Sequence, residues 1–411
     1  MKEKALNFID KSAFVFFGIL VFFLPISSAV IESCFGFIFF CFILKVVIKR
    51  PDLEAIKEFF KERINLSLLV FYIFIGVSMI NSGPYFAKSF SAWFFKWGEG
   101  VLLFYFGQVF LDKKKVKILL LVFVFSGVLV SIDGIYQKIF GIDFIRDFSL
   151  MAASGFNAIT ATFRHYNNFS SFLIVLFFIN CGFLIKTKTR IFRVFLFLSS
   201  LFIVIDILFT YSRGAWLSFL MVSFFLAVFF TNKRIRATSL VFLLVFTLGI
   251  ASLPAIRERF AYIFQIGGDT DRFRVWSAAI LMFKASPLFG QGLGTFMDYI
   301  NKYGSQYLVA QYAHNCYLQI LAETGIAGLL SFLWFLGELM FRGYYKLKKT
   351  FNFLFIGLFC GILAFLVHSF FDTQLFSLKL SVLFWVMASF LAVYIHSGYS
   401  TNCPGGPNKQ L

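Results

Sequence analysis

Long runs of apolar residues recur along almost the whole chain and decide what it can fold into. A helix needs about 20 residues to cross a hydrocarbon layer of about 30 Å, and a soluble core cannot hide so much apolar surface. Hydrophobic residues fill 60% of the 411 positions and charged residues only 14%. We therefore predict an all-α, polytopic integral membrane protein with about 12 transmembrane helices and one large helical loop on the outer side. The expected spans lie near residues 13–27, 29–44, 64–80, 90–111, 116–132, 168–185, 191–209, 215–231, 237–253, 320–341, 353–371 and 377–396.

The first two spans are predicted to form one short helical hairpin. Lys11 and Lys45 bracket an apolar stretch that is too long for one span, and Pro25-Ile26-Ser27-Ser28 supplies the turn. The length of this region and the lack of a small-residue cleavage site argue against a removed signal peptide.

Basic residues gather in alternate loops and set the expected orientation. If those loops face the cytoplasm, that side holds 25 of the 38 Lys and Arg residues but only 8 of the 20 acids. The positive-inside rule accounts for this asymmetry, so both termini are predicted to be cytoplasmic, and the net charge of +18 indicates membrane lipids and no nucleic acid as partners. The six cysteines show no paired or metal-ligand spacing, so we expect no disulfide framework and no structural zinc.

Two outer loops are much longer than the other connections. One runs near residues 133–166, and the other occupies about sixty residues between Leu253 and Ala313. Loops of this length are usually functional. In the second loop, an amphipathic stretch follows Pro254, Asp269 or Asp271 is placed to cap a second helix, and a glycine-rich turn at 290–294 ends that helix.

An ionisable imidazole stands where the tenth span begins, in the segment His314-Asn315-Cys316-Tyr317-Leu318-Gln319. Such a group at the membrane boundary is a candidate for function. A neutral imidazole can accept a proton, and an N-terminal helix position keeps it neutral. Glu323 falls on the opposite face of that helix and is not expected to orient His314.

Arginines on the same side provide cations that suit phosphate oxygens. Arg213 lies in the very short hairpin Tyr211-Ser212-Arg213-Gly214-Ala215-Trp216, and Arg272 precedes Trp276 by one helical turn. Arg274 lies about 160° from Arg272 around a helix, so the two cannot both point at one ligand, and we favour Arg272.

The motif His-Asn-x-x-Leu-Gln at 314–319, Ser212-Arg213-Gly214 and Arg272-x-x-x-Trp276 resemble elements of the bacterial O-antigen ligase family. This family belongs to the O-antigen ligase and polymerase superfamily of membrane glycosyltransferases. The resemblance implies an inverting, metal-independent transfer, without a cofactor, from an undecaprenyl-diphosphate-linked glycan donor to a lipid A-core sugar hydroxyl. It places the active site on the periplasmic face of the bacterial inner membrane. The O-antigen polymerase and the protein O-oligosaccharyltransferase share the donor and remain alternatives.

By residue, the resemblance implies that Arg213 and Arg272 hold the diphosphate and that His314 is the catalytic base. Arg164 and Arg274 are further predicted diphosphate-binding residues, because both lie on the outer side. Contacts to donor or acceptor are also predicted, and the residues are His165, Asn315, Trp276 and His368.

The predicted organisation has four parts. Residues 1–253 form transmembrane helices 1–9 and contain the shorter outer loop. Residues 254–315 form the large periplasmic loop with the catalytic elements. Residues 316–397 form transmembrane helices 10–12, and residues 398–411 form a disordered cytoplasmic tail.

Two other interpretations are weaker. Asp269-Thr270-Asp271 matches a metal-binding Asp-x-Asp pattern, but loop acids after two glycines more often cap helices, and we expect no metal. A lipid-linked glycan flippase or other transporter also fits twelve spans, yet transporters place ionisable residues near the bilayer midplane. Here Glu99 and Asp206 are the only acids predicted within spans on the outer half.

Overall fold

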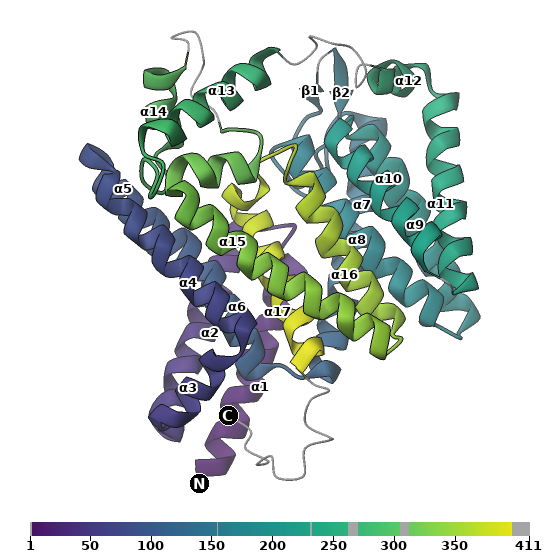
Figure 1. Ribbon diagram of the computed structural model, residues 1–411. Coiled ribbons are helices and arrows are strands. Elements are labelled where there is room, and N and C mark those ends of the chain that lie inside the picture. Colours follow the sequence, from purple (N-terminus) through teal and green to yellow (C-terminus); the bar gives the residue numbers. More distant parts are fainter. Residues whose placement is uncertain (1, 154, 231, 262–269, 305–311, 397–411) are drawn as a thin grey trace.

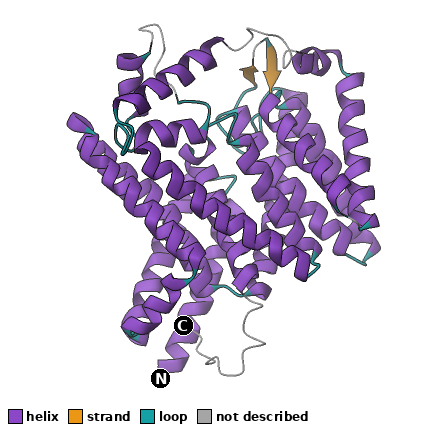
Figure 2. Ribbon diagram, in the orientation of Figure 1, coloured by secondary structure: helices purple, strands orange, loops and turns teal. Residues whose placement is uncertain are grey.

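The computed structural model describes residues 2–153, 155–230, 232–261, 270–304 and 312–396, and Figure 2 shows that these are almost entirely helical. The α-helices are α1 (Lys2–Phe23), α2 (Ser28–Lys49), α3 (Leu53–Lys61), α4 (Arg63–Val77), α5 (Phe86–Ser91), α6 (Gly98–Phe110), α7 (Lys113–Phe140), α8 (Tyr166–Lys186), α9 (Arg190–Phe209), α10 (Arg213–Phe229), α11 (Lys233–Ser252), α12 (Pro254–Ala261), α13 (Thr270–Ala285), α14 (Phe296–Tyr303), α15 (Cys316–Lys349), α16 (Phe353–His368) and α17 (Leu378–His396). Short 3₁₀ or π turns are η1 (Ser78–Asn81), η2 (Gly83–Tyr85), η3 (Ala92–Trp97) and η5 (Gln374–Phe376).

Each of the twelve predicted spans falls mostly on helix. Within the described residues, nine helical segments are long and apolar enough to cross a membrane, and α10 and α16 are shorter apolar helices. The fourth predicted span, 90–111, is divided among the end of α5, the π-helical stretch η3 and α6. The prediction of an all-α polytopic membrane protein is confirmed.

The helices run between two faces of the bundle. One face, which we call the loop face, carries α12, α13, α14 and a β-hairpin, at the top of Figure 1. The opposite end, the basic face, carries α3 and the lysine-rich last turn of α15. About nine-tenths of the residues in α8 and α17 are buried in the protein, but only about a quarter of those in α1, α2 and α11 are buried. α8 and α17 therefore form the centre of the bundle. α1, α2 and α11 present apolar side chains outward, as lipid-facing helices do.

The shorter outer loop differs from the prediction. α7 continues to Phe140, so Asp133 lies inside the helix and the loop begins at Gly141. The loop contains two antiparallel strands that the sequence does not predict, β1 (Met151–Ala153) and β2 (Phe156–Ala158). Strands of three residues carry too little alternation to be recognised.

The large loop is helical where it is described. α12 and α13 match the two predicted helices, but α13 ends at Ala285, before the glycine turn, and a further helix, α14, follows that turn. Gly290, Gly292 and Gly294 all have positive φ values of 69°, 107° and 75°. Asp269, the stretch from 262 to 266 and the predicted tail 398–411 lie outside the described residues.

α8 and α16 run antiparallel and pack closely, most tightly toward their basic-face ends. A Cβ on Gly357 would lie 2.4 Å from the Phe178 carbonyl oxygen, and one on Gly182 2.9 Å from the Phe353 carbonyl oxygen. Small residues allow this approach, as is common between membrane helices. Since α8 begins and α16 ends at the loop face, residues near 165 and 368 become neighbours there.

α15 is broken near its start. Gly325 adopts φ 67° and ψ −168°, a backbone conformation that an L side chain rarely takes. The break exposes backbone groups that bond to the loop before α14: the Gln291 and Gly292 amides donate to the Ala322 and Glu323 carbonyls at 3.0 and 2.9 Å. In return, the Ile326 and Ala327 amides donate to the Pro287 and Leu288 carbonyls at 2.9 and 3.2 Å. The first turns of α15 and the loop are thus joined through four backbone hydrogen bonds.

Candidate active site

His314 lies at the loop face, just before α15. The helix begins at Cys316 with Asn315 as its N-cap, so His314 stands outside the helix that the sequence placed it in. Its φ of 49° is in the left-handed region, which costs energy for a residue with a Cβ. Strain of this kind persists only where the surroundings fix it and is concentrated at functional sites.

A carboxylate orients the His314 ring. His314 Nδ1 lies 3.1 Å from Asp372 Oδ1, in the turn between α16 and α17, and the Asp372 side chain is only 10% exposed. Burial acts to raise the pKa of Asp372, but the hydrogen bond from His314 and the charges of His314, His165 and His368 outweigh it and hold the pKa well below its usual range. An ionised carboxylate only accepts hydrogen bonds, so in the neutral imidazole the proton lies on His314 Nδ1 and the lone pair on Nε2.

The other polar residues of the motif hold this turn in place. The Asn315 side chain accepts from the Tyr317 and Leu318 amides, both at 3.0 Å, and so caps α15. Gln319 Oε1 accepts from the Ala313 amide at 3.0 Å. The motif is therefore one oriented imidazole together with the bonds that fix the backbone on both sides of it.

Glu323 extends this hydrogen-bond network to α14, a connection that the sequence does not predict. It accepts from Gln319 Nε2 at 3.2 Å and from the Gly294 and Phe296 amides at 2.8 and 3.3 Å, at the start of α14. As expected, it does not bond to His314. It links the first turns of α15 to α14.

The Ser212-Arg213-Gly214 element packs on the end of α16. Ser212 Oγ accepts from the Ala215 amide at 3.4 Å, which caps α10, and lies 3.5 Å from His368 Nε2. A Cβ on Gly214 would lie 3.0 Å from His368 Cδ2, so a side chain there has no room. His368 Nδ1 lies 2.9 Å from Ser171 Oγ on α8. His368 thus ties α8, α10 and α16 together and sets where Arg213 begins α10.

Three arginines converge on the same place. The charges of Arg259, Arg272 and Arg213 and that of Asp372 all act on the Tyr166 side chain at the start of α8. These arginines come from three different elements, α12, α13 and α10. Arg259 is buried, and its Nε donates to the Tyr211 carbonyl at 3.3 Å. Three cations from separate elements therefore lie near one point at the loop face.

His165 belongs to this cluster as well. It is the N-cap of α8, where its Nδ1 accepts from the Asn167 amide at 3.1 Å, and its ring stacks on Tyr166 at 4.4 Å between centroids. Burial lowers the pKa of His165, the charges of His314 and Arg272 act in the same direction, and Asp372 opposes them. Three of the chain's four histidines thus meet at one end of the bundle.

The remaining predicted site residues lie in three different places. Arg164 lines a separate cavity of about 530 Å³ with Arg146 and Lys379, although its neighbour His165 is in the cluster. Arg274 is exposed on α13. Trp276 donates from Nε1 to the Ala313 carbonyl at 2.9 Å, so it connects α13 to the residue before His314.

Sequence reasoning missed two residues of the cluster. Asp372 is 58 positions from His314 along the chain, and Arg259 lies in a stretch noted only as amphipathic. Both fall on the outer side in the predicted topology, which was the one signal available for grouping them with His314.

The fold and the site define a polytopic membrane protein with a cluster of oriented histidine, carboxylate and arginine at one end of its helix bundle. Residues 197–333 match the family model described as O-antigen ligase. This match confirms the resemblance inferred from the sequence. Asp372 and His165 lie outside the matched range.

A curated relative agrees with this family. The chain is 26% identical over 271 residues to a protein named ComP-specific O-oligosaccharyltransferase, from Acinetobacter baylyi (strain ATCC 33305 / BD413 / ADP1). The similarity covers 62% of this chain and 46% of the relative, so the chain spans about half the length of that protein. The two matches agree in kind, since one is described as a ligase and the other is named an oligosaccharyltransferase.

Proposed function

We propose that this protein transfers a glycan from undecaprenyl diphosphate to a sugar hydroxyl of lipid A-core, with inversion and without a metal. The observation that carries the proposal is the His314–Asp372 pair beside three arginines. Glycosyl transfer of this kind needs a base for the incoming hydroxyl and cations for the leaving diphosphate, and the cluster contains both.

His314 is the proposed catalytic base. Its Nε2 lone pair takes the proton of the acceptor hydroxyl, and Asp372, which keeps the imidazole in that tautomer, stabilises the imidazolium that results. The acceptor oxygen attacks the anomeric carbon as the bond to the diphosphate oxygen breaks. The leaving diphosphate departs with its electron pair and its negative charge.

Arg213 and Arg272 are proposed to bind that diphosphate. Guanidinium groups form paired hydrogen bonds to phosphate oxygens, and the buried Arg259 adds a fixed positive charge beside them. Arg164 and Arg274 take a weaker part in this proposal, because Arg164 lines another cavity and Arg274 points to an exposed surface. Lipid-facing helices around the bundle suit a polyprenyl chain. If the basic face lies in the cytoplasm, the active site at the opposite end faces the periplasm.

A second candidate is transfer to a protein acceptor. The specific observation in its favour is the name of the curated relative, an O-oligosaccharyltransferase. Both candidates share the donor, the base and the arginines, and they differ only in the hydroxyl that approaches His314.

The deciding experiment supplies the purified full chain with undecaprenyl-diphosphate-linked glycan and one acceptor at a time: lipid A-core, free glycan or a serine-containing peptide. We expect glycan to appear on lipid A-core. Transfer only to peptide selects the second candidate, and transfer to free glycan selects a polymerase. No release of diphosphate with any acceptor, in a preparation that binds the donor, contradicts the proposed function.

A further inference from the structure

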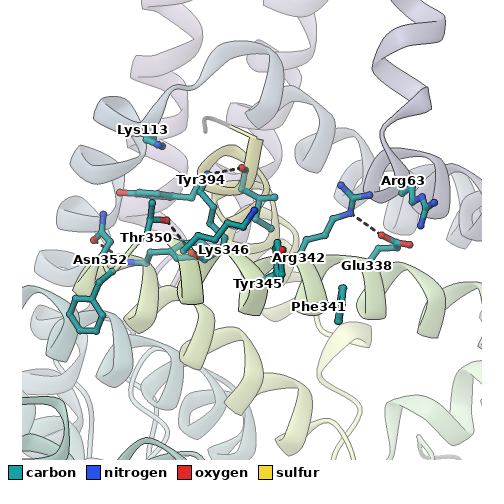
Figure 3. A pocket seen from close by; sticks show the side chains of 14 residues that line it. Arg63, Lys113, Glu338, Phe341, Arg342, Tyr345, Lys346, Thr350, Asn352 and Tyr394 are labelled. Atoms are coloured by element: carbon teal, nitrogen blue, oxygen red, sulfur yellow. Dashed lines mark hydrogen bonds and ion pairs between the residues drawn. The ribbon is translucent and has the colours of Figure 1, made fainter. Parts of the chain in front are cut away.

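A cavity of about 820 Å³ opens at the basic face, at the opposite end of α15 from His314. Figure 3 shows its lining side chains on α15 between Lys113 on one side and Arg63 on the other. Nothing in the proposed transfer reaction uses this region.

The lining of this cavity, which we call the basic pocket, is strongly positive. Five basic side chains face one acid, Glu338, and that acid is already hydrogen-bonded to Arg342 at 2.9 Å. Arg342 also lies 3.7 Å from Glu62. The basic residues of the lining are Arg63, Lys113, Arg342, Lys346 and Lys349.

The lysines of the pocket repel one another. The charges of Lys113 and Lys349 both act on Lys346, whose ammonium donates to the Ile395 carbonyl at 3.3 Å. A carbonyl satisfies one hydrogen bond without cancelling the charge. An anion in the pocket would cancel it, and the N-terminus of α16, which Asn352 caps at the pocket wall, favours negative charge as well.

Exposed aromatic side chains flank the pocket. Phe341 is 70% exposed, Phe351 55% and Tyr345 48%, and all three line the cavity. Tyr345 stands near the end of α15, and tyrosines at the end of a membrane helix occupy the level of the lipid headgroups. A soluble anion would neutralise the lysines but leave these rings uncovered, whereas a phospholipid places a phosphate among the lysines and acyl chains against the rings.

We propose that the basic pocket binds the phosphate headgroup of an anionic phospholipid, in the leaflet opposite the site of transfer. Basic pockets between transmembrane helices commonly bind such headgroups. The occupant is defined by a phosphodiester with a net negative charge and two acyl chains.

The test is native mass spectrometry of the purified full chain, titrated separately with phosphatidylglycerol and with phosphatidylcholine. We expect wild type to retain phosphatidylglycerol at least about tenfold more tightly, because only that lipid carries a net negative charge. Equal retention of the two lipids overturns the proposal.

Matched variants locate the site. Lys113→Gln/Lys346→Gln/Lys349→Gln should weaken phosphatidylglycerol binding about 100-fold, at about fivefold per lysine. The control, Lys57→Gln/Lys61→Gln/Lys188→Gln, removes the same charge from exposed positions outside the pocket and should bind like wild type. An equal loss in both triple variants would mean diffuse attraction to the basic face and would overturn the pocket.

Single-lysine variants and a competition with inorganic phosphate complete the test. If the triple variant does not fold, as judged by its thermal midpoint, Lys346→Gln alone should lose about fivefold, and Lys346→Arg should lose nothing. Millimolar inorganic phosphate should not displace the lipid. Full displacement by phosphate would identify a soluble anion as the occupant and contradict the proposal.

Discussion

The two ends of α15 both stand among positive charges, yet they hold them in different ways. At the loop face, His314 has one bonded orientation, set by Asp372 on its ring and by Gln319 on the adjacent backbone. At the basic face, Lys346 and Lys349 lie near other cations, and the surrounding aromatic side chains are exposed. Bond making requires fixed geometry, whereas holding a mobile headgroup requires only charge and apolar surface. Activity at the loop face should therefore depend on the geometry of the side chains, and lipid binding at the basic face on their charge.

The strongest way to break this comparison is His314→Ala. We expect transfer to fall by about 10² to 10⁴, because the base is lost, while the amount of protein in the membrane stays normal. The measurement is turnover of the purified variant with the donor and lipid A-core. Near-wild-type turnover would remove His314 from the mechanism and leave the loop face with no more chemistry than the basic face.

Asp372→Asn tests orientation without removing the base. The amide keeps the size of the side chain but not its charge, so we expect kcat to fall by up to about 10⁴-fold, as in a Ser-His-Asp triad, with little change in the donor KM. Measuring kcat and KM separately distinguishes this positioning role from a loss of binding. An unchanged kcat, with only the thermal midpoint lowered, would make Asp372 purely structural.

Charge-conserving changes compare the two ends directly. Arg213→Lys and Arg272→Lys keep the charge but lose the paired geometry, and each should reduce kcat/KM about tenfold, the value of one charge-assisted hydrogen bond of roughly 1.5 kcal/mol. Lys346→Arg at the basic face should leave phospholipid binding intact. Full activity of both lysine variants would show that the loop face, too, depends only on charge.

Gly325→Ala tests whether the break in α15 holds the site in place. The new Cβ would lie 2.4 Å from the Leu288 carbonyl oxygen, and the backbone conformation costs about 1–3 kcal/mol for alanine. We expect a lower thermal midpoint and a several-fold loss of activity. The control is Gly337→Ala on the same helix, where a Cβ meets nothing within 4 Å and stability should hold or rise. Equal behaviour of the two variants would contradict a role for the break.

The smallest expected effect concerns metals. Arginines and a divalent cation are alternative ways to balance a diphosphate, and the cluster supplies arginines. We expect transfer to survive excess EDTA and Asp269→Asn to be nearly silent. Loss of activity in the chelator, restored by Mg²⁺ in wild type but not in Asp269→Asn, would make the Asp-x-Asp element a metal site.

The sequence predicted the spans because hydropathy is a local property, and it placed Arg213 and His314 on one side through the loops between those spans. It located His314 through a short motif but not Asp372. That contact depends on the turn after α16 reaching the start of α15, where the Cys316 amide donates to the Ser369 carbonyl at 2.9 Å. The break at Gly325 was also beyond prediction, because a glycine in a predicted span does not reveal which backbone will approach it.

At Gly325 a membrane helix exchanges part of its own hydrogen-bond ladder for bonds to a loop, and this links how the two segments open. The amides of Gln291 and Gly292 become free only when the first turns of α15 separate from the loop. In hydrogen exchange, these loop amides should be as slow as those of Ile326 and Ala327, although they belong to no helix. The loop thereby stays closed as long as a buried helix does, and the backbone next to His314 stays in place with it.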